Sequence, residues 1–119
     1  MWLVTLFFFI GSSATATADD DVSKWQPQTV EQAVKVYGDK YGVNEDLLNY
    51  IIKCESGFNI SSVGDKGKSF GLVQIHLPSH PEVTKQQALD FNFAVEFLSK
   101  NIAEGKADMW TCYRNLNEV

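Results

Sequence analysis

The stretch "NEDLLNYIIKCESG", residues 44–57, predicts an amphipathic helix that carries a glutamate in its last turn. Asn44 suits the N-terminal cap of this helix, and Gly57 suits a left-handed C-terminal cap. The apolar stripe and the carboxylate follow helical spacing at i, i+3, i+4 and i+7: Leu48, Ile51, Ile52 and Glu55. The pattern therefore places Glu55 on the face that packs inward.

Two interpretations of Glu55 follow from this position. A carboxylate that borders an apolar stripe can lean into solvent and pair with Lys53 or Lys85. A buried carboxyl group instead has its pKa raised from about 4.3 toward about 6, because desolvation opposes the charged form. A glutamic acid that is still protonated near neutral pH can donate its proton to a glycosidic oxygen. We favour the buried acid.

Two further segments show helical spacing of apolar residues. The first begins at Thr29, where Thr29 and Gln32 predict a capping box, and Gly42 ends it. The second begins at Thr84 or Asp90, because either residue can cap a helix. We expect Gly105 to close this last helix.

The segment between the second and last helices is rich in glycine and turn residues. Residues 64–67 predict a turn, and residues 70–75 predict a short strand-like segment. Pro78 and Pro81 predict a loop. The fold class we expect is mainly α, of the α+β kind, with a small β-hairpin.

The N-terminal stretch has the pattern of a secretory signal. An apolar run over residues 3–10 precedes Ala16-Thr17-Ala18, which has the A-x-A form of a cleavage site. An uncleaved membrane anchor is the alternative, but the run is shorter than the roughly 20 residues that a span needs. We therefore expect an exported protein, periplasmic or extracellular, without a stable membrane span.

This interpretation divides the chain into four parts. We expect a cleaved signal peptide over 1–18, a polar lead-in over 19–28, one folded domain over 29–114 and a short tail over 115–119.

Cys54 and Cys112 are the only cysteines of the 119 residues, which predicts one disulfide in an exported chain. Two buried free thiols are the alternative. The sequence indicates no metal or organic cofactor, since two distant cysteines lack the close spacing of a zinc site. A formal net charge of −5 does not favour a nucleic-acid partner.

Three motifs in order carry a family resemblance: "CESGFN" (54–59), "GDKGKSFGLVQI" (64–75) and "MWTCYR" (109–114). Together they resemble the catalytic core of soluble lytic transglycosylases and of the related goose-type lysozymes, over about residues 44–114. The resemblance implies a lysozyme-like fold that binds the glycan strands of peptidoglycan in a cleft. It also implies a bond between the cysteine before the catalytic glutamate and the one in the last motif.

The resemblance assigns roles to individual residues. Glu55 matches the catalytic acid of these families, and Ser56, Phe70 and Gln74 match residues that line the cleft near the acid. Tyr113 lies in the region where many transglycosylases place the tyrosine that orients the acid. The resemblance thus implies substrate binding by Ser56, Phe70, Gln74 and Tyr113.

Asp65 and His76 lie where goose-type lysozymes usually have two aspartates. Asp65 matches one of them and is the possible second carboxylate, although an aspartate in a Gly-Asp-Lys-Gly turn often only bonds its own backbone. His76 replaces the other. His76 and His80 are predicted to be loop histidines, with His80 at the rim of the cleft, because Pro78 between them argues against a helical metal motif.

Three functions are consistent with these residues. A lytic transglycosylase needs only Glu55, which acts as acid and then as base to give a 1,6-anhydro-muramic acid product. A hydrolysing goose-type lysozyme needs a second carboxylate, for which Asp65 is the candidate. A non-catalytic peptidoglycan-binding module needs neither. We favour the transglycosylase, and we expect it to be a monomer.

Overall fold

The computed structural model describes residues 25–117, and side chains over 25–116. The predicted signal peptide (1–18) and the first part of the predicted lead-in lie outside this range. Within it, no helix combines the length and the apolar character needed to cross a bilayer.

The described chain is mostly helical, with a small antiparallel sheet, which confirms the expected fold class. The α-helices are α2 (Val30–Tyr41), α3 (Glu45–Ser56), α4 (Lys85–Leu89), α5 (Phe91–Ala103) and α6 (Thr111–Asn117). The strands are β1 (Val63–Gly64), β2 (Ser69–Phe70) and β3 (Ile75–His76). Two short 3-10 helices complete the structure, η2 (Leu77–Ser79) and η3 (Ala107–Met109).

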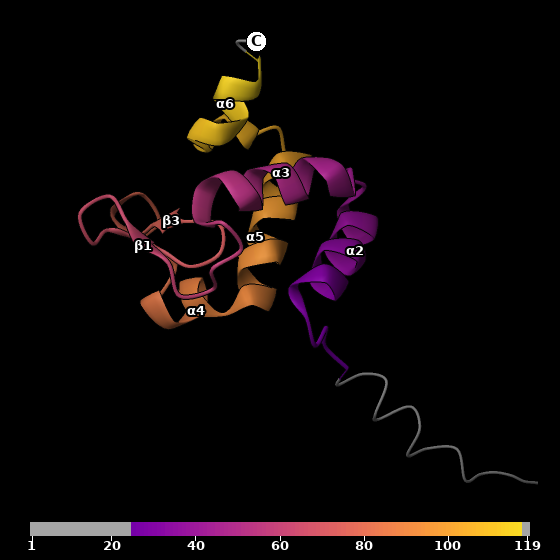
Figure 1. Cartoon of the computed structure of the whole chain (residues 1–119), viewed down its shortest axis with the longest axis horizontal. Coiled ribbons are helices and arrows are strands. Elements are labelled where there is room, and N and C mark those ends of the chain that lie inside the picture. Colours follow the sequence, from indigo (N-terminus) through magenta and orange to yellow (C-terminus); the bar gives the residue numbers. More distant parts are fainter. Residues whose placement is uncertain (1–24, 118–119) are drawn as a thin grey trace, which may run out of the picture.

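The helices surround α5, which crosses the centre of the fold (Figure 1). α2 packs along α5, and both of these helices contact α3. The sheet and α4 lie on the side away from α2, and α6 lies beyond α3 at the other end of the molecule (Figure 1). α3 therefore runs from the helical side toward the sheet, and its last turn ends there.

The predicted apolar stripe of α3 forms the centre of the core. Leu48, Ile51 and Ile52 are fully buried. They belong to one cluster with apolar residues of α2, the sheet region and α5, among them Val34, Leu72, Val73, Val95 and Leu98. Burial of this stripe fixes the rotation of α3 and hence the direction of its last turn.

The caps of α3 are those that the sequence predicts. The Asn44 side chain accepts hydrogen bonds from the backbone N–H groups of Asp46 and Leu47, and Gly57 ends the helix at φ 61°. Gly42 ends α2 in the same left-handed conformation, at φ 68°.

The predicted capping box at Thr29 is only half right. The Thr29 hydroxyl oxygen accepts from the Gln32 N–H at 3.1 Å, as predicted. The Gln32 side chain, however, accepts from the Gln28 N–H at 2.7 Å. The side chain of Gln32 thus reaches one residue further back along the chain than the motif requires.

The two residues predicted as alternative starts of the last helix, Thr84 and Asp90, each begin a separate helix. Thr84 caps α4 in a complete capping box with Gln87, and Asp90 caps α5 with bonds from the Asn92 and Phe93 N–H groups. The two helices are separate because Asp90, with φ −85° and ψ 117°, is extended. Gly105 follows the C-cap residue Glu104 with φ 80°.

The predicted hairpin is a three-stranded sheet in the order β1-β2-β3. Val63 pairs with Phe70, and Phe70 pairs with Ile75, so β2 is the central strand. The turn after β2 needs glycine at position 71, where φ is 85° and an added Cβ would lie 1.9 Å from the Ala88 carbonyl oxygen. This close approach holds α4 against the sheet.

The predicted boundary between the domain and the tail, at residue 114, falls within helix α6. Helix α6 continues to Asn117, so part of the predicted tail is helical. α6 contacts α3 and η3. These contacts stabilise a helix that is too short to be stable alone and too short to show a periodic pattern in the sequence.

Candidate active site

Glu55 lies in the last turn of α3 and is half-buried, as the buried-acid interpretation requires. One of its carboxylate oxygens accepts a hydrogen bond from the backbone N–H of Cys112 at 3.4 Å. No ion pair links Glu55 to Lys53 or Lys85 among the described residues. The solvent-paired alternative is therefore not what the structure shows.

Burial, one hydrogen bond and two charges act on the acid. Burial raises the pKa of Glu55 above its ordinary value of 4.5, and the nearby carboxylate of Asp65 also raises it. The Cys112 N–H and the Arg114 guanidinium lower the pKa, because both stabilise the carboxylate. Burial is the largest of these effects, so the pKa of Glu55 is raised overall.

A disulfide joins Cys54 to Cys112, with the two Cα atoms 6.1 Å apart. It attaches the last turn of α3 to the first turn of α6. Because Cys54 directly precedes Glu55, the bond also holds the Cys112 N–H beside the carboxylate. The two free thiols that were the alternative are not present.

A cleft of about 440 Å³ opens beside this segment. Its walls come from the turn before β2, from β3 and η2, from α5, and from the segment before α6. The lining residues are Asp65, Gln74, Ile75, His76, Ser79, His80, Phe97, Met109 and Trp110. Glu55 is not among them. It lies close to the cleft, because Asp65 lines the cleft and acts on the pKa of Glu55, and because Trp110 lines the cleft two positions before Cys112, whose N–H bonds Glu55.

The family model described as the transglycosylase SLT domain matches residues 32–118, most of the described fold. The chain belongs to the transglycosylase SLT domain family. No solved structure was found to match the chain.

Membership of the SLT domain family implies transglycosylase activity of the peptidoglycan-cleaving type, and hence a peptidoglycan substrate. Among residues 25–117, no three His, Cys, Asp or Glu side chains gather in a way that could hold a metal ion.

Asp65 lines the cleft, and its carboxylate also accepts a hydrogen bond from the Ser69 hydroxyl. Its backbone has φ 50°, in the tight turn between β1 and β2. Asp65 thus lies in the predicted turn, where its carboxylate bonds the Ser69 hydroxyl instead of its own backbone, and it also lies near Glu55. The structure brings the two carboxylates of the sequence prediction into one neighbourhood.

Gln74 lines the cleft, but its side chain also holds the sheet region together. The amide nitrogen donates to the carbonyl oxygens of Ser62, at 3.1 Å, and Gly71, at 2.9 Å. Both amide hydrogens are used in this way, which leaves the side-chain oxygen as an acceptor. The left-handed backbone of Gln74, at φ 54°, shows how tightly this turn is constrained.

The other predicted substrate residues lie elsewhere. The Ser56 hydroxyl donates to the Ile52 carbonyl oxygen of its own helix at 3.2 Å. Phe70 is a core residue, 8% exposed, and the Lys85 ammonium lies 5.0 Å from its ring centroid. Tyr113 packs against the core from α6. None of the three is among the residues that line the cleft.

Both predicted loop histidines line the cleft. The loop prediction is wrong for His76, which belongs to β3 because it pairs with Ser69 of β2. Its Nδ1 lies 2.8 Å from the Ser79 hydroxyl. The His80 ring packs edge-on against Phe97 at 5.1 Å, and its Nδ1 lies 3.5 Å from the Glu82 carboxylate. His80 thus lies on the cleft wall, and its place at the rim stays a prediction.

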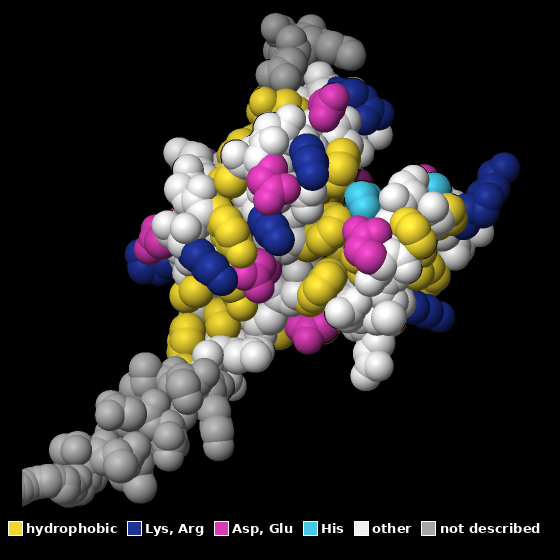
Figure 2. Space-filling model, turned by 180° about the vertical axis from the view of Figure 1, so that it is seen from behind, with side chains coloured by type: hydrophobic (Ala, Val, Ile, Leu, Met, Phe, Trp, Pro, Cys, Tyr) yellow, Lys and Arg dark blue, Asp and Glu magenta, His cyan; other side chains and the backbone are white. Residues whose placement is uncertain are grey.

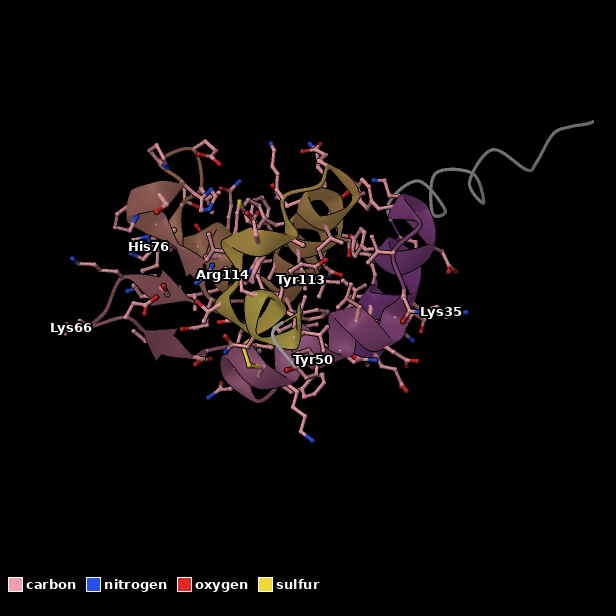
Figure 3. All side chains as sticks on the ribbon, turned by 90° about the horizontal axis from the view of Figure 1, so that it is seen from above. Lys35, Tyr50, Lys66, His76, Tyr113 and Arg114 are labelled. Atoms are coloured by element: carbon pink, nitrogen blue, oxygen red, sulfur yellow. A yellow bond between two sulfur atoms is a disulfide. The ribbon has the colours of Figure 1, made fainter. Side chains whose placement is uncertain are left out.

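Arg114 is a residue near the acid that no sequence pattern indicated. Its guanidinium donates to the Asp108 carbonyl at 2.6 Å and to the Thr111 hydroxyl at 2.8 Å, and it acts electrostatically on Glu55. Figure 3 shows Arg114 on the side of α6 nearer the sheet and His76, with Tyr113 on the side nearer the other helices. The cysteine pairing was the available signal, since it brings the start of α6 to Glu55.

Proposed function

We propose that this chain is a lytic transglycosylase that cleaves the β-1,4 bond between N-acetylmuramic acid and N-acetylglucosamine in peptidoglycan. The observation that carries the proposal is the half-buried Glu55, whose pKa is raised by burial. A raised pKa favours the protonated form of the carboxyl group, and a protonated glutamic acid is the group that donates to a leaving glycosidic oxygen.

Glu55 acts first as an acid. Its carboxyl proton moves to the bridging oxygen, the bond from that oxygen to the muramic acid C1 breaks, and the glucosamine part leaves with a free hydroxyl. The N-acetyl oxygen of the muramic acid stabilises the positive charge that develops at C1. This substrate group takes the part that a second carboxylate plays in ordinary glycosidases.

Glu55 then acts as a base. Its carboxylate removes the proton from the C6 hydroxyl of the same muramic acid, and the C6 oxygen bonds to C1. The product is a 1,6-anhydro sugar, and Glu55 regains its proton without water taking part. The Cys112 N–H and the Arg114 guanidinium stabilise the carboxylate between the two steps.

Gln74 is the residue that we propose for orienting the substrate. Its amide is fixed by the bonds to Ser62 and Gly71, so its oxygen can accept a sugar hydroxyl without further loss of side-chain freedom. Ser56, Phe70 and Tyr113 have less support for direct contact, because their polar or aromatic groups are engaged within the fold.

One observation favours a second candidate, a hydrolysing lysozyme. Asp65 lies on the cleft wall and close enough to Glu55 to affect its pKa, so it can hold a water molecule for attack at C1. Its existing bond with the Ser69 hydroxyl weakens this candidate, because that bond occupies one of its oxygens.

The decisive experiment is mass spectrometry of the products released from purified sacculi. Anhydro-muropeptides are expected, and products with reducing ends would support hydrolysis instead. Glu55→Gln should lower the rate by a factor of about 10² or more, since it removes the general acid. Asp65→Asn is the matched control, and it should retain the anhydro product. Intact lysis by the Glu55→Gln variant would contradict the assignment of the acid.

We also propose that the chain is exported and that its signal is removed after Ala18. The apolar run over residues 3–10, followed by the A-x-A pattern, supports export. The disulfide also supports it, because such bonds form in oxidising compartments. N-terminal sequencing of the protein recovered outside the cytoplasm should begin at Asp19, and recovery of a chain that begins at Met1 would contradict cleavage.

A further inference from the structure

A second hollow, of about 340 Å³, lies beside the cleft along α5. We call it the α5 groove. It is lined by Gln87 of α4 and by Phe93, Phe97, Lys100 and Asn101 of α5. Figure 2 shows the back of the molecule, where hydrophobic side chains lie in a hollow among acidic and basic ones.

The groove and the cleft share a wall. Phe97 lines both, and it packs edge-on against Trp110 of the cleft at 6.1 Å between ring centroids. A second link is the contact between His80 of the cleft and Glu82 of the groove, 3.5 Å apart. The two hollows are therefore neighbours on the surface, with Phe97 between them.

The floor of the groove is aromatic. Phe93 and Phe97 are one helical turn apart on α5, and their rings are nearly parallel, with centroids 6.0 Å apart. Both side chains are only partly buried. Flat aromatic faces of this kind pack against the apolar C–H faces of sugar rings.

The polar groups beside this floor are already held in place. The Gln87 side-chain oxygen accepts from the Thr84 N–H in the capping box, at 2.9 Å, which leaves its amide hydrogens as donors. The Asn101 amide nitrogen donates to the Phe97 carbonyl at 2.8 Å, which leaves its oxygen as an acceptor. A preorganised donor and acceptor beside an aromatic floor suit the hydroxyl groups of a sugar.

The charged residues of the groove favour neutral ligands over acidic ones. Glu82 and Glu104 line it together with a single cation, Lys100. This excess of carboxylates disfavours the acidic stem peptides of peptidoglycan, whereas neutral sugar units carry no penalty.

We infer that the α5 groove is a distal binding site for further sugar units of the glycan strand whose reacting part lies in the cleft. This inference rests on the proposed function. It adds that long strands bind more tightly than short ones, and that Phe93, Gln87 and Asn101 produce the difference.

The test uses β-1,4-linked N-acetylglucosamine oligomers, a trimer and an octamer, bound to the Glu55→Gln chain and measured by calorimetry. The octamer should bind at least tenfold more tightly than the trimer. Phe93→Leu keeps an apolar side chain but removes the aromatic face, and it should weaken octamer binding about fivefold while trimer binding stays unchanged. Phe91→Leu is the matched control on the same helix and should have no effect on either.

A second pair of variants tests the polar side of the groove. Gln87→Glu keeps the oxygen that caps α4 but removes the amide donor, so octamer binding should weaken about fivefold or more. Gln86→Glu makes the same charge change on the neighbouring exposed residue and should not alter binding.

Equal affinity for trimer and octamer, no octamer binding, or equal effects of Phe93→Leu and Phe91→Leu would overturn the inference. So would a muropeptide trimer that binds as tightly as the octamer, because the stem peptide would then occupy the groove. These outcomes are independent of the products from sacculi. A groove that binds long oligomers would stand even if Glu55→Gln left lysis intact, and only the proposed function would then fail.

Discussion

At the scale of single residues, the properties of Glu55 come from a balance between burial and nearby charges. Desolvation favours the protonated form, Asp65 adds to this effect, and Arg114 and the Cys112 N–H oppose it. The same side chain must hold a proton before the reaction and carry a negative charge during it. A partly buried carboxyl group with a cation nearby is suited to both states.

This balance predicts opposite effects of two substitutions on the pH dependence of activity. Because the acid must be protonated, activity should fall as the pH rises through the raised pKa of Glu55. Arg114→Gln removes a charge that lowers this pKa, so the alkaline limb of kcat/KM should move to higher pH. Asp65→Asn removes a charge that raises the pKa, so the limb should move to lower pH. The measurement is kcat/KM on sacculi across the pH range.

The Arg114→Lys variant tests whether the positive charge of Arg114 or its hydrogen bonds affect the pKa of Glu55. The lysine keeps the positive charge but loses the paired bonds to the Asp108 carbonyl and the Thr111 hydroxyl. The alkaline limb should therefore stay near its original position. Shifts in the same direction for Arg114→Gln and Asp65→Asn would refute the electrostatic account of the acid.

At the scale of elements, the disulfide joins two helices that the chain reaches at very different points. Glu55 and Cys112 are 57 positions apart, and α6 has only seven residues. Such a short helix is marginal by itself, so contacts with α3 and the covalent bond hold it. The position of the Cys112 N–H, and thus one hydrogen bond to the acid, depends on this attachment.

Replacing both Cys54 and Cys112 by serine should destabilise the protein. The chain-entropy account gives a loss of about 4 kcal/mol for a closed loop of roughly 60 residues, and this should appear as a lower denaturation midpoint in urea. The wild type under reducing conditions is the control and should show a similar midpoint. An unchanged midpoint in the double variant would show that packing alone positions α6.

At the scale of the whole molecule, the buried acid makes folding stability depend on pH. The pKa of Glu55 is raised in the folded protein above its ordinary value of 4.5. The folded state therefore binds the proton more tightly than the unfolded state does. This contribution to stability is present in full below about pH 4.5 and is lost as the pH rises through the raised pKa.

The Glu55→Gln variant lacks this dependence, which makes it the reference. The free energy of unfolding of the wild type, relative to that of Glu55→Gln, should decrease as the pH rises above 4.5, the ordinary value for the carboxyl group. Urea denaturation at a series of pH values measures the difference between the two proteins. A difference that is constant with pH would mean that Glu55 is solvated in the folded state.

Local features of the fold were predictable because their causes are local. Asn44, Gly42 and Gly57 act on backbone groups a few positions away, and they end or begin helices where the sequence predicts. The stripe on α3 depends only on spacing along one helix. The inward direction of Glu55 followed from the same spacing.

The features that the sequence did not indicate depend on contacts between distant segments. Phe70 has a residue type suited to sugar stacking, but its place on the central strand puts it in the core. Arg114 and Phe97 gave no local signal, and tertiary packing brings one toward Glu55 and the other into the cleft wall.

The sequence by itself therefore determined the three main helices, the position of the acid and, through its motifs, the family to which the chain belongs. Only the tertiary structure decided which side chains surround that acid, the extent of α6 and the position of a second hollow along α5. The physical reason is the distance along the chain over which each interaction acts. Helix caps and apolar spacing act over a few residues, whereas burial, electrostatic effects and shared walls arise from segments that meet only after the chain has folded.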